Sequence, residues 1–172
     1  MLVQKKLNVG TLLDSTASQT DNGTIEKYCY NDETTNCTAY GGFYQWDEAM
    51  QYYTTIGAQG ICPTGWHIPT NAQLHILEDA VASDGNALKA IGEGDSDGVG
   101  TNTSGFSALL AGDRAYNSFF NALGYYTTFW SSDQFVGIVN VGYLLVLRYN
   151  NSIISINNGD KSYGFSVRCL KN

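Results

Sequence analysis

The feature that most constrains this chain is a set of four cysteines with no Cys-x-x-Cys spacing. An even number of cysteines in that arrangement favours disulfides over a metal site. Cys29 and Cys37 flank the polar stretch NDETTN and could close it into a loop. Cys62 and Cys169 could tie the middle of the chain to its end. The alternative is four buried thiols in a reducing compartment.

Helix signals are confined to the first half of the chain. The strongest covers residues 70–82, where Thr70 and Gln73 can form a capping box ahead of apolar residues on one face. A shorter helix is expected over residues 46–53. Residues 1–44 are predicted to be loops and short strands, because turn dipeptides interrupt them.

From Phe106 onward the pattern is that of β-strands, with short apolar or aromatic runs separated by turns. Residues 143–149 and 153–156 are predicted to form a hairpin, and 163–169 a final strand. Helices early and strands late predict an α+β fold. The length, 172 residues, suits a single domain spanning 1–172.

The charge distribution argues against nucleic-acid binding. The net charge is −7, and residues 1–114 hold 14 acidic and 5 basic residues, a net charge of −9. Residues 115–172 hold 2 acidic and 4 basic residues. Phosphate-backbone binding needs clustered lysine and arginine. We also expect no direct membrane insertion, because no apolar stretch is long enough, and no signal peptide is visible in MLVQKKLNVG.

Six segments, in this order, carry a resemblance to a known family: IEKYCYND, YGGFYQWDEAMQY, GAQGICPTGWHIPT, TSGFSALLAGDR, FWSS and YGFSVRCLKN. Over about residues 7–172 the chain resembles the Fibrobacter succinogenes major paralogous domain, found in secreted bacterial proteins. CPTGWHIPT and GFSVRC are the most specific segments. The resemblance implies a C-type-lectin-like fold, with two helices and a twisted antiparallel sheet. It also implies that the terminal strand places Cys169 near Cys62.

The same domain is similar to the variable proteins of diversity-generating retroelements. In those proteins, adenine-specific mutagenesis rewrites selected codons near the C-terminus, chiefly asparagine codons, which cannot become Lys, Glu, Gln, Met or Trp. Trp130 and Gln134 are exceptions here, and they lie in FWSSDQ, where the family pattern is fixed. Residues 115–160 contain no Lys, Glu or Met, whereas ordinary usage would give about five or six Lys and Glu. The resemblance therefore implies a diversified ligand-binding region at about 115–163.

Alternation along residues 143–149 separates two faces of the expected strand. Leu145 and Leu147 look inward-facing, and Leu144, Val146 and Arg148 should share the other face. The alternative is a strand buried on both sides. The full set of candidate ligand-binding positions is Tyr116, Asn117, Tyr125, Tyr126, Thr128, Ile138, Val139, Asn140, Tyr143, Leu144, Val146, Arg148, Ile153, Ser155, Asn157, Asn158, Asp160 and Tyr163.

These positions are rich in Tyr and Asn, the residue types that supply rigid contact area and adaptable hydrogen bonds in binding surfaces. We expect them to form one contiguous exposed patch. The implied function is a receptor- or adhesin-type variable protein on a virion surface, or extracellular on a cell surface. Its partner would be a protein or glycoconjugate on a host or neighbouring cell, and an oligomer is possible. The alternative is a non-diversified adhesin or glycan-binding module.

An enzymatic or metal-dependent activity is not expected. Cys62 and His67 could in principle form a nucleophile–base pair, but His67 lies in a segment that the family keeps for its fold. The calcium-ligand motifs of sugar-binding C-type lectins are absent. Glu93, Asp95 and Asp97 alternate in a Gly-rich loop and could bind a hard cation, although a solvated acidic loop is the default. We therefore expect no cofactor and no metal.

Overall fold

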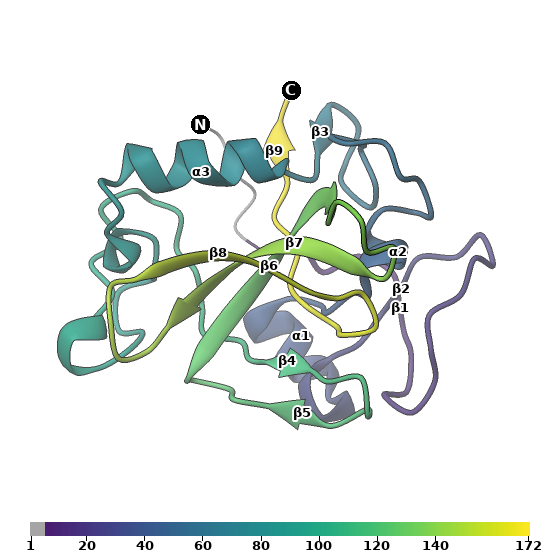
Figure 1. Cartoon of the computed structure of the whole chain (residues 1–172). Coiled ribbons are helices and arrows are strands. Elements are labelled where there is room, and N and C mark those ends of the chain that lie inside the picture. The colour runs from purple at the N-terminus through teal and green to yellow at the C-terminus, as the bar shows by residue number, and fades with distance from the viewer. Residues whose placement is uncertain (1–5) are drawn as a thin grey trace.

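The structure, a computed structural model, describes residues 6–172 and is of mixed α+β type (Figure 1). The α-helices are α1 Thr34–Tyr40, α2 Trp46–Ala49 and α3 Asn71–Ala80, and 3-10 turns cover Tyr30–Asp32, Gly85–Ala87 and Ser96–Gly98. The strands are β1 Thr11–Leu12, β2 Glu26–Lys27, β3 Trp66–His67, β4 Asp113–Arg114, β5 Phe120–Asn121, β6 Tyr126–Gln134, β7 Val141–Arg148, β8 Ile154–Asp160 and β9 Leu170–Lys171. Most strand pairs are antiparallel, and β1 and β2 pair in parallel.

Helix α3 confirms the capping signal. The Thr70 side chain accepts a hydrogen bond from the Gln73 backbone N–H, and the Gln73 side chain accepts one from the Thr70 N–H. The helix ends at Ala80, two residues before the predicted end, because Ala82 has a positive φ of 52°. The helix predicted over residues 46–53 is also shorter than expected, because α2 covers only the single turn Trp46–Ala49.

The prediction of loops and short strands for residues 1–44 is wrong around the first cysteine pair. Residues 34–40 form helix α1, although Thr and Asn are weak helix formers. The Cys29–Cys37 disulfide closes this segment, with Cα atoms 5.0 Å apart. The Asn36 side chain also donates to the Tyr30 carbonyl, at 2.8 Å. Tertiary restraint thus overrides local propensity here.

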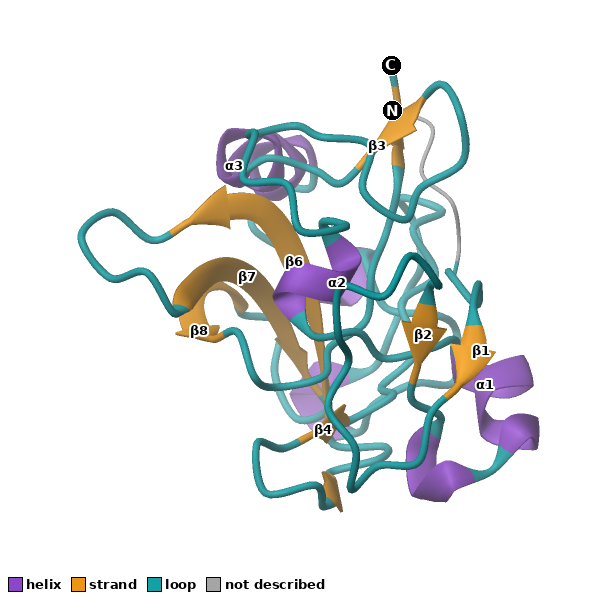
Figure 2. Ribbon diagram, turned by 90° about the vertical axis from the view of Figure 1, so that its right-hand side faces the viewer, coloured by secondary structure: helices purple, strands orange, loops and turns teal. Residues whose placement is uncertain are grey.

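The largest sheet is antiparallel, in the order β6–β7–β8, and its curvature is visible in Figure 2. It contains the predicted hairpin as β7 and β8, in which Leu144 lies opposite Asn157 and Leu145 opposite Ile156. Leu145 and Leu147 are buried on the face that packs against α3. Leu144 is buried on the other face, against Trp46 of α2. The centre of the sheet is therefore core on both sides.

The final segment is extended but is not the predicted continuous strand. Phe165 pairs with Tyr44, and Ser166 pairs with Phe129, as single bridges to different partners. A regular strand, β9, begins only at Leu170 and pairs with β3. The segment crosses between separate elements, so no single neighbour supplies a continuous ladder of hydrogen bonds.

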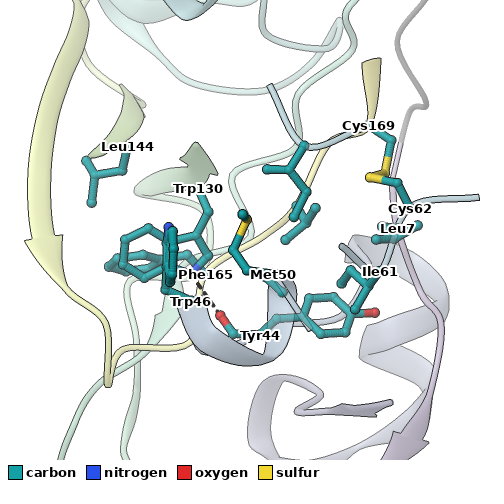
Figure 3. Packing of buried hydrophobic residues seen from close by; sticks show 13 residues of the cluster. Leu7, Tyr44, Trp46, Met50, Ile61, Cys62, Trp130, Leu144, Phe165 and Cys169 are labelled. Carbon is teal, nitrogen blue, oxygen red and sulfur yellow. Dashed lines mark hydrogen bonds between the residues drawn. A yellow bond between two sulfur atoms is a disulfide. The ribbon is translucent and has the colours of Figure 1, made fainter. Parts of the chain in front are cut away.

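The terminal segment is also fixed covalently. Cys169 is bonded to Cys62, with Cα atoms 5.8 Å apart. Figure 3 shows this disulfide at one end of a buried cluster whose other end holds Trp46, Trp130 and Phe165. Both indole N–H groups of the cluster are satisfied: Trp130 donates to the Tyr44 carbonyl and Trp46 donates to the Ser131 carbonyl. This core supports the sheet face that bears Leu144.

Candidate ligand-binding groove

One face of the β6–β7–β8 sheet carries an open groove of about 570 Å³. Its twelve lining residues are Asp113, Tyr126, Thr128, Leu144, Val146, Arg148, Asn157, Asn158, Gly159, Asp160, Tyr163 and Phe165. Nine of them are candidate positions from the sequence; the other three are Asp113, Gly159 and Phe165. Strand register explains the convergence, because Tyr126 lies opposite Arg148 and Thr128 opposite Val146, which places their side chains on one face.

The floor of the groove is apolar and belongs to the core. Leu144 is only 5% exposed and Thr128 only 2%, so these two candidates are not the freely exposed positions that the sequence suggested. Leu144 belongs to the same buried cluster as Trp46 and Phe165, which come from segments distant in sequence, and alternation along one strand does not reveal this. Val146 is half-buried beside them.

Aromatic rings form one wall of the groove. The Tyr163 ring stacks on the Phe165 ring, with centroids 5.6 Å apart and planes inclined by 27°. The Tyr116 ring is 66% exposed and lies 5.6 Å from the Tyr163 ring, so Tyr116 borders the groove as expected. Phe165 in turn packs against Trp130, at 4.6 Å. The wall is therefore a rigid continuation of the core.

A buried carboxyl group lies at the end of the groove where β4 meets β6. The Asp113 side chain accepts hydrogen bonds from the Tyr126 hydroxyl and from the Asn121 amide. Burial raises the pKa of Asp113, and those two hydrogen bonds partly oppose the shift. Burial, followed by the hydrogen bond to Asp113, raises the pKa of Tyr126. The exposed Arg148 guanidinium lies 5.9 Å from the Tyr126 ring centroid.

The opposite rim is formed by the end of β8 and the turn after it. Asn157, Asn158 and Asp160 are exposed. The Asp160 carboxylate accepts hydrogen bonds from the backbone N–H and hydroxyl of Ser162, at 2.8 and 2.7 Å. The groove thus combines an apolar floor and aromatic wall with amide, carboxyl and guanidinium groups at its edges.

The remaining candidates do not line the groove. Tyr143 belongs to the opposite sheet face with Leu145, and its ring contacts Phe135 at 5.3 Å. Its expected convergence with Leu144 is therefore wrong, because adjacent strand residues point to opposite faces. Tyr125 packs against Tyr149 at 4.9 Å. The other candidates outside the lining are Asn117, Ile138, Val139, Asn140, Ile153 and Ser155.

Asp113 lines the groove but is not among the positions expected from the sequence. It lies in the segment TSGFSALLAGDR, which carries part of the family resemblance, beside the buried Arg114. Arg114 holds a different part of the fold, because its guanidinium donates to the Ser15 and Ser162 carbonyls. Only the spatial pairing of Asp113 with Tyr126 identifies the carboxyl as a groove residue.

The other chemical candidates have structural contacts. The Glu93 carboxylate accepts a hydrogen bond from the Leu110 N–H at 2.8 Å. Both ring nitrogens of His67 are engaged, by Asn172 and Gln73. Within residues 6–172 no three His, Cys, Asp or Glu side chains are grouped to hold a metal ion. The same residues contain no helix with the length and apolarity to cross a bilayer.

One known family matches almost the entire chain. A family model described as the Fibrobacter succinogenes major domain matches residues 5–171. No curated protein and no solved structure matches the chain. The matched range contains the whole groove and both disulfides.

Proposed function

The chain belongs to the Fibrobacter succinogenes major domain family, and from that membership we propose that it is a ligand-binding protein acting through the groove on the β6–β7–β8 sheet. The observation that carries the proposal is the convergence of nine candidate positions on one concave surface. Binding sites are typically concave, largely apolar, and furnished with a few polar groups that fix orientation.

The chemistry of the groove suits a protein segment or a glycoconjugate on a host or neighbouring cell surface. Tyr163 and Phe165 offer flat aromatic area, and Val146 adds an apolar contact. Asn157 and Asp160 supply hydrogen-bonding groups at one rim, and Arg148 supplies a cation at the other. Rigid aromatic anchors surrounded by adaptable polar groups are the usual composition of a binding surface.

We further propose that the protein is a C-type-lectin-like variable protein whose groove is diversified by a retroelement, and that it is displayed on a virion or cell surface. Support comes from the absence of Lys, Glu and Met between residues 115 and 160. It also comes from the placement of Arg148, Asn157 and Tyr163 on a framework that is fixed by the core and a disulfide. Such a framework allows side chains to change while the backbone keeps its shape.

A binding assay tests the proposed site. The purified protein is applied to arrays of surface glycans and displayed surface proteins, and each ligand found is retested with Tyr163→Ala and Val146→Arg. Both variants should weaken binding at least about tenfold, as expected for residues within a binding hot spot. Ile91→Ser is the control, because Ile91 is exposed and does not line the groove. Equal binding by all four proteins would contradict the assignment of the site.

The second candidate is a non-diversified adhesin or glycan-binding module. The burial of Leu144 and Thr128 favours it, because positions that serve the core cannot vary freely. The neighbourhood of the gene separates the two candidates. A reverse transcriptase and a near-repeat of the C-terminal coding segment are expected for a diversified protein, and their absence favours the second candidate.

A further inference from the structure

Lys89 is fully buried, at 0% exposure, and its ammonium group lies in a cage of main-chain oxygens. Its Nζ donates to the carbonyls of Gly98, Arg148 and Asn151, the last two at 2.8 and 2.9 Å. An ammonium has three protons to donate, so these contacts satisfy it completely. Among residues 6–172 the ion pairs are His75–Glu78 and Lys161–Asp47, and Lys89 takes part in neither of them.

The cage joins two segments that are distant in sequence. One is the Gly-rich acidic loop of residues 92–100, and the other is the turn of residues 148–153, which begins at the last residue of β7 and leads to β8. The Asp95 N–H donates to the Tyr149 carbonyl at 2.9 Å, and the Gly85 N–H donates to the Ser152 carbonyl at 2.6 Å. Each of these bonds ends on a main-chain atom of the hairpin, so none depends on the identity of a hairpin side chain.

Close approach of the two backbones requires glycine at position 98. A Cβ atom there would collide with the carbonyl oxygen of Tyr149. On the solvent side of the same turn, Arg148, Asn150 and Ile153 are exposed. The scaffold therefore holds the inside of the turn by its backbone, while the side chains of these three residues face solvent.

A buried ammonium is costly unless it is hydrogen-bonded. Burial lowers the pKa of Lys89, and the charge of Asp84 partly opposes that shift. The ring of carbonyl oxygens offsets the loss of hydration in the way that carbonyl ligands stabilise a bound metal ion. The charged side chain of Lys89 thus connects the acidic loop to the turn through three main-chain carbonyl groups.

We propose that Lys89 is a positioning residue for the groove: its ammonium fixes the Arg148 end through the backbone of the hairpin and leaves the side chains there free to change. The inference rests on the proposed function, because a fixed backbone at residue 148 matters for binding only if the groove is the ligand-binding site. It explains how residue 148 can be replaced without altering the shape of the groove. Lys89 and the loop of residues 92–100 hold the turn through its main-chain carbonyl groups.

The first test is nuclear magnetic resonance of the wild-type protein near pH 7. We expect a slowly exchanging ammonium resonance for Lys89, with couplings across hydrogen bonds to the carbonyl carbons of Gly98, Arg148 and Asn151. A rapidly exchanging signal, or the chemical shift of a neutral amine, would overturn the proposal. This measurement needs no variant and is therefore independent of any folding defect.

The second test is amide hydrogen exchange in variants. Lys89→Met should raise the exchange rate of the Asp95 and Gly85 amides about tenfold, which corresponds to roughly 1.4 kcal/mol of local stability. Lys171→Met, at an exposed lysine, is the control and should leave both rates unchanged. Arg148→Ala and Arg148→Tyr should also leave them within about twofold. Faster exchange in the Arg148 variants would show that the side chain holds the turn, contrary to the proposal.

These tests separate the two proposals, because neither uses a ligand. Loss of the ammonium signature removes the role of Lys89 and leaves binding by the groove open to its own assay. If the signature and the exchange pattern are found but Tyr163→Ala binds every ligand normally, the backbone clamp stands and the proposed binding site fails.

Discussion

Replacing Leu144 tests whether this residue forms the buried floor of the groove or part of its exposed surface. It is 5% exposed and packs against Trp46 and Phe165. Leu144→Ala removes three carbon atoms from the core, and at about 0.8 kcal/mol per buried carbon the transfer contribution is roughly 2.4 kcal/mol. A partly collapsed cavity brings the expected loss of unfolding free energy to about 3 kcal/mol.

The assay is urea unfolding with both disulfides intact, followed by tryptophan fluorescence and circular dichroism, with wild-type protein alongside. Arg148→Ala is the matched control from the same face of β7. Because Arg148 is exposed, its replacement should change the unfolding free energy by less than about 0.5 kcal/mol. If Leu144→Ala and Arg148→Ala agree within that margin, Leu144 does not form the floor and the assignment of the strand faces is wrong.

Two further predictions concern the framework. Replacing both Cys62 and Cys169 by Ser should lower the free energy of unfolding by about 4.8 kcal/mol, because their disulfide closes a loop with a sequence separation of 107. The same change at Cys29 and Cys37, whose sequence separation is 8, should lower it by about 2.5 kcal/mol. Equal losses in urea melts would contradict this ranking. The raised pKa of Asp113 means that its contribution to stability is full below the unfolded-state pKa and is lost as pH rises through the folded-state value. Asp113→Asn should therefore gain stability relative to wild type between pH 4 and 7, and a constant difference across that range would refute the shift.

Local signals in the sequence predicted part of the fold. The Thr70–Gln73 capping box and the β7–β8 hairpin depend on neighbouring residues, so a single sequence carries them. Helix α1 does not follow from its Thr- and Asn-rich sequence, because a disulfide and the Asn36 contact hold it. The terminal segment was predicted as one strand because alternation does not show that Phe165 and Ser166 pair with different partners.

The candidate site was predictable to the extent that it follows strand alternation. Alternation correctly grouped Leu144, Val146 and Arg148, which all line the groove. It could not show that Leu144 joins a buried cluster with Trp46, nor that Asp113 accepts a hydrogen bond from Tyr126, since both arrangements bring distant segments together. Tyr143 was grouped with Leu144, Val146 and Arg148 against its own alternation, and the structure places it on the opposite face.

The most direct test of the diversified groove is deep sequencing of the coding segment for residues 106–172 in a population that carries this gene. We predict that substitutions arising from adenine changes concentrate at the codons of exposed groove residues, such as Arg148, Asn157 and Asn158. The buried codons Leu145 and Leu147, on the α3 side of the same strand, should stay constant. An invariant segment, or substitutions spread evenly over groove and core codons, would contradict the claim that this surface is diversified for binding.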